Sequence, residues 1–375
     1  MCSSATGKAA AGISTQTMHI PDGYLSPSTC AVLYACAGSG WYAALRRVKR
    51  AFGARTVPLV SVFAAFTFVV MLFNIPLPGG TTGHAVGVAV AAIVLGPSAA
   101  ILAISIALAI QALLFGDGGI TTFGANCFNM AIVGSLVAYG VYQVIASNSP
   151  VCSRRRVWAS AIAGYTAVNA AAFLTAVEFG IQPVLFHDAA GTPLYAPYPL
   201  RIAIPAMMIG HLTFAGLAEA VISAGMISYL QRADLGLLGA VNPAAGQIEL
   251  EASGTIESRR VWWVVALLLL GTPLGVLATG TAWGEWSTSD LADPVVRGEI
   301  ARSSGNRPLP AATPRGLEKI STLWTAPFPG YAPKFVKNPV FGYLLSALFA
   351  VGLLIAGSLA VTAMSKRWHR TEFRS

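Results

Sequence analysis

Two histidines have the position and the neighbours needed to bind a metal ion. His19 follows Met18 directly, and His84 follows a turn of glycine and threonine at 79–83. If the chain begins at Met18, its free amine, the amide nitrogen of His19 and the His19 imidazole can chelate one metal in five- and six-membered rings. His84, on the same side of a membrane, would fill the fourth position. Square-planar nitrogen ligation suits Ni(II), and tetragonal nitrogen ligation also suits Cu(II).

Three polar residues could hold these imidazoles in place. Asn126 and Asn129 stand three positions apart, so they share one face of a helix, and Asp117 precedes them in the same outer region. Side chains of this kind orient metal-binding imidazoles from a second layer of contacts. The alternative is that they only cap a helix at the glycine-rich turn 116–119, and the sequence leaves both explanations open.

Five other ionisable residues are expected to lie outside the set of ligands. Glu178 is expected to pair inside the bundle, because an unpaired charge there is costly. His187 and Asp188 fall in an outer loop and are expected to be solvated. His211 and Glu219 lie within an apolar run and are expected to pair with buried polar groups or with a partner subunit.

The composition is that of a polytopic membrane protein. Of the 375 residues, 55% are hydrophobic and only 10% are charged, against roughly 25% charged in soluble domains. These values exclude an ordinary soluble domain and a disordered chain. The net charge of +9 lies in short clusters between apolar runs, which indicates membrane topology and not nucleic-acid binding. The five cysteines form no C-x-x-C pair, so neither a disulfide framework nor a zinc site is expected.

Nine apolar runs predict an all-α, polytopic membrane helical bundle of about seven runs plus a two-helix C-terminal module. A helix needs about 20 residues to cross roughly 30 Å of hydrocarbon, and most runs reach that length. The run at 84–95 is short, and a Gly-Pro pair separates it from the next run. The runs lie at about 25–44, 57–75, 84–95, 98–115, 120–146, 158–180, 202–231, 261–280 and 338–364.

Counting these runs as nine crossings places every basic cluster on one side, which should be the cytoplasm. The Met18 end then lies outside a cell membrane and the C-terminus inside. The clusters are Arg46, Arg47, Lys49, Arg50 and Arg55; Arg154, Arg155 and Arg156; Arg232; Arg259 and Arg260; and Lys366, Arg367 and Arg370.

The same pattern divides the chain into four parts. We expect a disordered extension or miscalled start at 1–17, a metal-capture membrane domain at 18–232 and a cytoplasmic linker at 233–258. A two-helix module with a long extracytoplasmic loop at 281–337 follows at 259–375.

Three stretches carry a resemblance to a known family: Met18–Leu25 (MHIPDGYL), Thr82–His84 (TGH) and Gln111–Met130 (QALLFGDGGITTFGANCFNM). They closely resemble the CbiM/NikM family, the cobalt and nickel substrate-capture subunits of energy-coupling-factor (ECF) transporters, over about 18–230. The resemblance implies that Met18, His19 and His84 are the metal ligands. It also implies that an ATPase and a transmembrane coupling subunit on other chains are partners.

The back part resembles the N-type subunit of the same transporters. Its features are the outer sequence Ala282–Trp286 (AWGEW) and Pro314–Glu318 (PRGLE), which matches the family motif PDGLE except that Arg315 replaces Asp. The chain is therefore interpreted as a fusion of two subunits. The back part lacks ligand-rich motifs and is expected to assist uptake without binding metal tightly.

The sequence thus predicts a substrate-binding membrane subunit of an ATP-driven nickel or cobalt uptake transporter, in contact with lipid and not with nucleic acid. Ni(II) or Co(II) would be its transported substrate, no resident cofactor is expected, and the choice between the metals stays open. The chain contains no G-x-x-x-x-G-K-[ST] phosphate loop, so ATP hydrolysis is assigned to other chains. The alternatives are a metal-dependent membrane enzyme and a proton-coupled secondary metal transporter.

The metal site predicts that the functional chain begins at Met18. A form of the protein that retains residues 1–17 should bind Ni(II) far more weakly than one starting at Met18, because a peptide nitrogen would replace the primary amine. Intact mass of the native protein identifies its first residue, and calorimetric titration of the two forms compares their Ni(II) affinities. Equal affinity would mean that the amine is not a ligand.

Overall fold

The computed structural model of the protein describes residues 19–50, 56–77, 81–233, 235–239, 258–278, 281–331, 333 and 335–372. Met18, the expected extension at 1–17 and most of the expected linker lie outside the described residues. The front part contains α1 (Pro27–Arg50), α2 (Thr56–Met71), β1 (Ile75–Leu77), β2 (Thr81–Gly83), α3 (Val88–Leu95), α4 (Pro97–Ile110), α5 (Phe123–Asn126), α6 (Gly134–Ala146), α7 (Arg154–Leu185), α8 (Leu200–Gly210), α9 (Gly216–Ala233) and α10 (Leu235–Gly239).

The back part is also helical. It contains α11 (Ser258–Gly271), α12 (Thr288–Ala292), α13 (Pro294–Ser303), α14 (Arg315–Ile320) and α15 (Pro339–Glu372). Wider π-helical turns at Gln111–Phe115, Cys127–Val133 and His211–Ala215 join α4, α5, α6, α8 and α9 into longer helices, and tighter turns lie at Thr272–Leu277 and Pro329–Tyr331. The predicted all-α membrane bundle is therefore confirmed.

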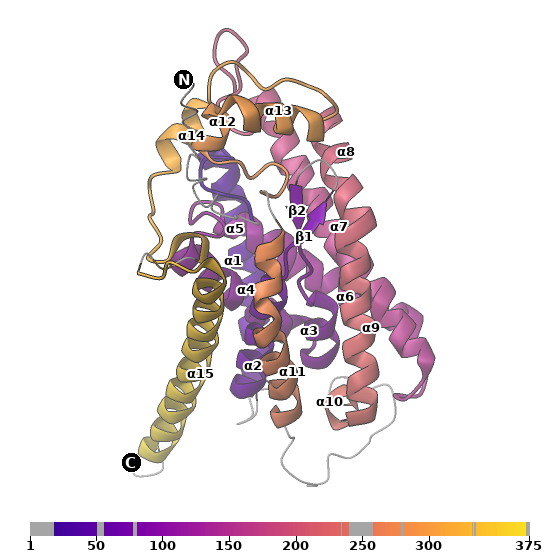
Figure 1. Ribbon diagram of the computed structural model, residues 1–375. Helices are drawn as coiled ribbons and strands as arrows, with labels where there is room; N and C mark the ends of the chain where they lie inside the picture. The colour runs from indigo at the N-terminus through magenta and orange to yellow at the C-terminus, as the bar shows by residue number, and fades with distance from the viewer. Residues whose placement is uncertain are drawn as a thin grey trace, which may run out of the picture.

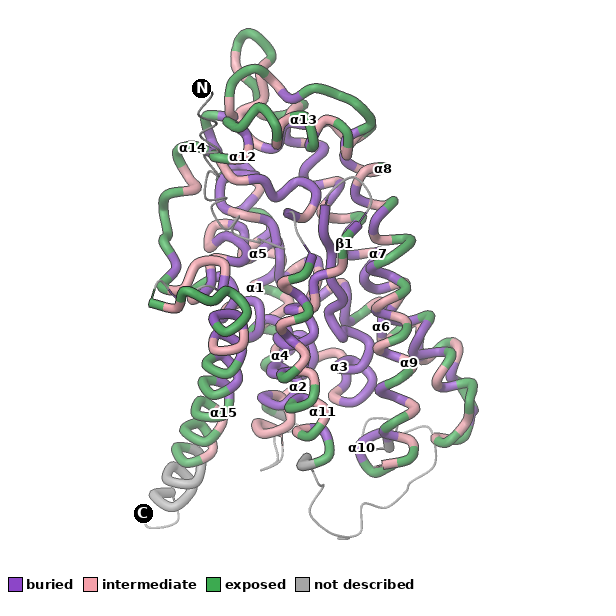
Figure 2. Tube along the Cα trace, viewed as in Figure 1, coloured by how far each residue is buried: buried purple, intermediate pink, exposed green. Residues whose placement is uncertain are grey.

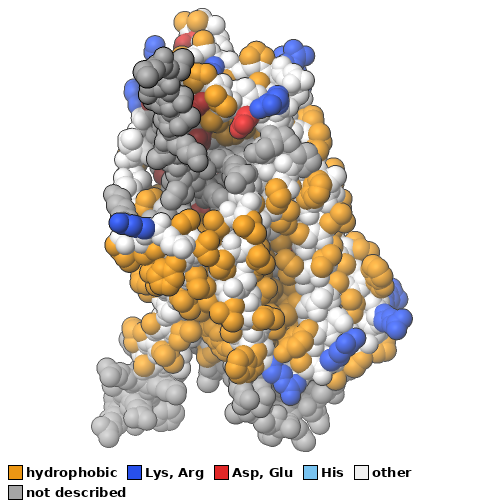
Figure 3. Space-filling view, in the orientation of Figure 1, with side chains coloured by type: hydrophobic (Ala, Val, Ile, Leu, Met, Phe, Trp, Pro, Cys, Tyr) orange, Lys and Arg blue, Asp and Glu red, His pale blue; other side chains and the backbone are white. Residues whose placement is uncertain are grey.

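Most of the long helices run lengthwise, and α12, α13 and α14 lie across one end (Figure 1). Within the described ranges, six helices are long and apolar enough to cross a membrane: Pro97–Phe115, Phe123–Ala146, Arg154–Leu185, Leu200–Ala233, Arg260–Leu277 and Pro339–Met364. Buried residues concentrate inside the bundle, and α15 is exposed along much of its length (Figure 2). Apolar side chains cover the middle of the visible face, with most Lys and Arg above or below them (Figure 3). This distribution is the one expected of helices that face lipid.

The short run at 84–95 is helical only in its second half. α3 begins at Val88, and its eight residues span about 12 Å. Gly87 has φ +73° and ψ 22°, a left-handed conformation that ends the helix on its N-terminal side. A Cβ at this position would lie 2.6 Å from the Phe66 ring, so only glycine fits there. The β1–β2 hairpin precedes this point, and His84 lies in the irregular backbone between hairpin and helix. Irregular backbone is tolerated at this depth because surrounding protein covers it.

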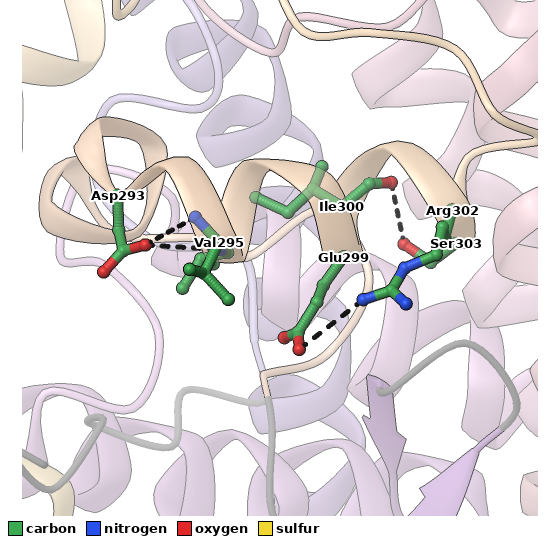
Figure 4. Close-up of polar contacts among 7 residues, drawn as sticks. Asp293, Val295, Glu299, Ile300, Arg302 and Ser303 are labelled. Carbon is green, nitrogen blue, oxygen red and sulfur yellow. Dashed lines mark hydrogen bonds and ion pairs between the residues drawn. The ribbon is translucent and has the colours of Figure 1, made fainter.

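The stretch at 281–337, which was predicted as a long outer loop and is called the outer stretch below, instead contains α12, α13 and α14. A serine–aspartate capping box begins α12. The Asp293 carboxylate accepts the Val295 N–H at 2.7 Å at the start of α13, and the exposed Glu299 and Arg302 pair at 3.7 Å along it (Figure 4). Such caps stabilise short helices, whose first N–H groups have no partner within the helix.

The PRGLE motif of the back part packs against the loop that precedes α1. Gly23 has φ +90°, and a Cβ on it would lie 2.6 Å from the Leu317 Cα. The Gly316 N–H also donates to the Leu194 carbonyl at 2.7 Å. The motif is thus docked on two loops of the front part.

Arg315, which replaces the aspartate of the family motif, lies near the half-buried Asp188. Backbone hydrogen bonds from Thr192 and Ala190 lower the pKa of the Asp188 carboxyl, and the positive charge of Arg315 lowers it further. The reversed charge of the motif is therefore compatible with its docking here.

Replacing Gly23 by alanine should lower the thermal unfolding midpoint of the detergent-solubilised protein more than replacing Gly191. Both residues have positive φ, +90° and +79°, so each substitution strains the backbone, but only at Gly23 does the new Cβ meet another segment. We expect Gly23→Ala to lower the unfolding midpoint by at least about 2 °C more than Gly191→Ala does. Equal shifts would contradict the docking of the back part on this loop.

Candidate metal site

The structure brings His19 and His84 together inside the bundle. Their ring centroids are 5.1 Å apart and the rings are nearly perpendicular, at 88°. The two residues are only 3% and 8% exposed. His19 lies in the loop ahead of α1, and His84 directly follows β2. Met18, the third predicted ligand, lies outside the described residues.

Several hydrogen bonds fix the loop that carries the first histidine. The Ile20 N–H donates to Asn126 Oδ1 at 3.1 Å, and the Ile20 carbonyl accepts from Asn126 Nδ2 at 3.2 Å. The same carbonyl accepts from the Gly119 N–H at 2.9 Å and from the Thr122 hydroxyl at 2.5 Å. The Asp22 carboxylate accepts two further N–H groups of the same turn. The loop therefore satisfies its backbone groups without being helical.

The His84 ring and the backbone that follows it are fixed separately. His84 Nδ1 lies 2.9 Å from the Ala85 carbonyl. Because a carbonyl only accepts, Nδ1 carries the proton and the lone pair is on Nε2. Glu219 on α9 accepts the N–H of Val86 at 2.6 Å and that of Gly87 at 2.9 Å. This buried carboxylate therefore pairs with the backbone, as expected, and holds the segment beside His84.

The His19 ring has one nitrogen that is bonded and one that is not. His19 Nε2 lies 3.1 Å from Gln111 Oε1, whereas Nδ1 is buried and makes no hydrogen bond in the described part of the chain. Buried polar atoms are usually paired, and Nδ1 is the atom that would close the six-membered chelate ring. Gln111 is not among the site residues predicted from the sequence. A lone glutamine in an apolar helix could have indicated it, because a buried amide needs partners.

Both histidines line an internal cavity of about 70 Å³. Two of the π-helical stretches reach its wall, through Met130 and His211, and the third carries Gln111. π-helical turns occur frequently at functional sites, and here they lie around the candidate metal site.

The back part of the chain also reaches this cavity. Ala282 and Glu285 line it together with the histidines. The Thr82 N–H donates to the Thr281 carbonyl at 3.4 Å, and the Thr82–Ala282 bridge is parallel. The tryptophans on either side of the Gly-Glu pair are buried. No residue of the back part was predicted to belong to the site, because the sequence does not indicate which part of the outer stretch turns inward.

Glu285 is the one carboxylate among the described residues that line the cavity. Burial raises the pKa of the Glu285 carboxyl well above its usual range, and the nearby Asp117 raises it further. A low-dielectric environment of this kind favours the neutral acid until a positive charge shares it.

A second cavity of about 270 Å³ shares part of its wall with the first. Thr82, Met207 and His211 line both cavities. Trp283 and Arg302, which belong to the outer stretch, line the second. His211 Nδ1 lies 2.9 Å from the Met207 carbonyl, which places the lone pair of His211 on Nε2.

The three predicted orienting residues take different partners. Asn126 holds the backbone next to His19. Asn129 Nδ2 donates to Glu178 Oε2 at 2.9 Å, so it pairs with the buried carboxylate. Asp117 Oδ2 accepts from the Tyr331 hydroxyl at 2.6 Å.

Comparison with protein families matches residues 19–237 to CbiM, the cobalt uptake substrate-specific transmembrane region. The chain belongs to the CbiM family. Residues 257–367 match the PDGLE domain, so the resemblance inferred from the motifs is confirmed for both parts. As a CbiM-family protein whose described residues include six apolar helices long enough to cross a membrane, the chain is a multi-pass membrane protein of nickel and cobalt transport.

Relatives of this CbiM-family chain share both of its parts. It is 50% identical over 354 residues to the fused nickel transport protein NikMN of Rhodobacter capsulatus, covering 93% of this chain and 99% of that protein. It is 39% identical over 339 residues to the probable fused nickel transport protein LarMN of Lactiplantibacillus plantarum, covering 89% and 94%. A crystal structure of a truncated transition metal transporter matches with a TM-score of 0.54 and 51% identity, over 57% of this chain and 99% of that one.

Replacing Asn126 by alanine should weaken nickel binding by about 10–100-fold, because the backbone beside His19 loses two hydrogen bonds. Asn169→Ala is the matched control, since Asn169 is also a buried asparagine but bonds the Tyr165 carbonyl of its own helix. Isothermal titration calorimetry of the detergent-solubilised proteins gives both affinities. An equal loss in the two variants would show that Asn126 has no particular role at the site.

Proposed function

We propose that this chain is the substrate-binding subunit of an ATP-driven, ECF-type uptake transporter and captures Ni(II) or Co(II) outside the cell membrane. The observation that carries the proposal is the buried pair of imidazoles, His19 and His84, in one cavity. His84 keeps its lone pair on Nε2, and His19 Nδ1 has no hydrogen-bond partner among the described residues. Neutral imidazoles are good ligands for nickel and related divalent metals.

Two further nitrogens would complete a planar set when the chain begins at Met18: its amine and the His19 amide. Loss of the amide proton would leave the metal complex with a single positive charge. A buried charge is unfavourable unless it is paired, and the Glu285 carboxylate supplies the opposite charge on the same cavity wall. A planar nitrogen site favours nickel, and the relatives NikMN and LarMN are named as nickel transport proteins.

The second cavity provides the route for the cation. It extends from the outer stretch to the wall that it shares with the metal cavity. His211 lines this shared wall, and its Nε2 lone pair would be an additional nitrogen donor that binds the ion only transiently.

The charge pattern supports the orientation and the partners. Arg46, Arg154 and Arg232 are exposed, and by the positive-inside rule we place their end of the bundle in the cytoplasm. The His19 loop and helices α12, α13 and α14 then lie toward the outside. With no phosphate loop in the sequence, ATP hydrolysis falls to an ATPase that acts through a transmembrane coupling subunit.

His19→Ala and His84→Ala should each abolish high-affinity nickel binding, because each removes a ligand from a four-nitrogen site. His187→Ala, in an outer loop, is the control and should bind nickel as the unchanged protein does. Calorimetric titration with Ni(II) and Co(II) measures binding, and uptake of labelled metal by cells that also express the ATPase and coupling subunits measures transport. Normal affinity in either of the first two variants would refute the site.

A further inference from the structure

Four buried side chains form a continuous hydrogen-bonded chain that begins at His19. His19 Nε2 lies 3.1 Å from Gln111 Oε1, and Gln111 Nε2 donates to the Tyr331 hydroxyl oxygen at 3.1 Å. The Tyr331 hydroxyl donates in turn to Asp117 Oδ2 at 2.6 Å. None of these four residues is more than 3% exposed, so bulk water does not compete for their hydrogen bonds.

The hydrogen bond at the far end determines the direction of the others. The Tyr331 hydroxyl donates its single proton to Asp117 Oδ2. The Tyr331 oxygen must then accept from the amide NH₂ of Gln111, which turns the Gln111 carbonyl oxygen toward His19. A carbonyl oxygen also only accepts, so His19 Nε2 carries the proton and the lone pair stays on Nδ1.

Tyr331 is held in an unusual backbone conformation. Its φ is +59°, a value that bulky residues rarely adopt because it is strained. The Tyr331 N–H donates to the Phe328 carbonyl at 3.2 Å, and its carbonyl accepts from the Ser346 hydroxyl at 3.1 Å. Its ring stacks on Phe115, with centroids 4.7 Å apart. Strain of this kind persists where the surroundings fix the residue, and it is found where a group must be positioned.

We infer that Tyr331 is a positioning residue of the metal site, which acts through Gln111 to keep His19 in the tautomer whose Nδ1 can bind the metal. The inference rests on the proposed function and deepens it. Tyr331 lies within the part of the chain that matches the PDGLE domain. The fused back part therefore sets the protonation pattern of a ligand in the front part.

The test compares Tyr331→Phe with Tyr343→Phe in the full chain. Tyr343 is also a buried tyrosine of the back part, with its ring 5.3 Å from that of Tyr331, but its hydroxyl donates to the Leu72 carbonyl at 2.9 Å. Both substitutions remove one buried hydroxyl and keep the ring. ¹⁵N NMR of metal-free, histidine-labelled protein reports which ring nitrogen carries the proton, with the His19 signal assigned by its loss in His19→Ala.

In the unchanged protein and in Tyr343→Phe we expect the proton on Nε2 alone. In Tyr331→Phe we expect a mixture of tautomers and a nickel affinity about tenfold lower by calorimetry. Gln111→Met removes the side-chain amide that connects Tyr331 to His19 and should give the same two changes. This second variant keeps the test valid if Tyr331→Phe fails to fold.

A single Nε2-protonated His19 with unchanged nickel affinity in Tyr331→Phe and Gln111→Met would overturn the inference. Equal losses in Tyr331→Phe and Tyr343→Phe would also overturn it, because a general loss of packing would then explain both. If the unchanged protein bound no nickel, the proposed function would fail instead. The tautomer measurement needs no metal, so the two failures are distinguishable.

Discussion

A divalent cation can be held among apolar helices only where fixed electron pairs replace its water shell, since the desolvation of an ion is unfavourable unless its new partners are already in place. In the proposed metal site that requirement applies to two ring nitrogens, one on His19 and one on His84. Each imidazole has its proton directed by an oxygen on its other side, from the Gln111 amide or the Ala85 carbonyl. The lone pairs are thereby assigned before any metal binds.

The two histidines lie on irregular backbone, and this explains much of the polar structure around them. A helix satisfies its own backbone groups, whereas a loop or a short hairpin inside a bundle needs partners from elsewhere. Asn126 and Asp22 provide or fix those partners for the first loop, and Glu219 provides them ahead of α3. Buried polar side chains therefore lie where the segments that carry the two histidines depart from regular structure.

The back part of the chain packs over the candidate metal site and also contributes residues to it. Leu317 packs on the loop of the first histidine at Gly23, and the Tyr24 hydroxyl donates to the Trp286 carbonyl at 2.7 Å. Glu285 lines the cavity, and Tyr331 extends the hydrogen bonds of His19 to Asp117. A physical reason for joining the two parts in one chain follows from these contacts. The fused module stays next to the candidate metal ligands, whose charge and protonation we propose it influences.

The sequence by itself determined the class of the protein and the identity of its principal candidate ligands. Apolar runs of about 20 residues allow few structures other than membrane helices, and His19 and His84 stand in motifs long enough to indicate the family. It did not show that the short run at 84–95 is helical only from Val88, because that limit is set by the left-handed backbone conformation of Gly87, with φ +73°, which apolar periodicity does not encode.

Only the tertiary structure decided which residues meet. Gln111, Glu285 and Tyr331 are far apart in the chain, and their roles come from contacts between segments, which periodicity and local propensity do not encode. The three helices within the expected loop at 281–337 were also not predicted. Short helices depend on their caps and on the surface against which they pack more than on the helix propensity of their residues. The candidate ligands could be identified from sequence motifs, whereas the groups that contact them are brought there by packing.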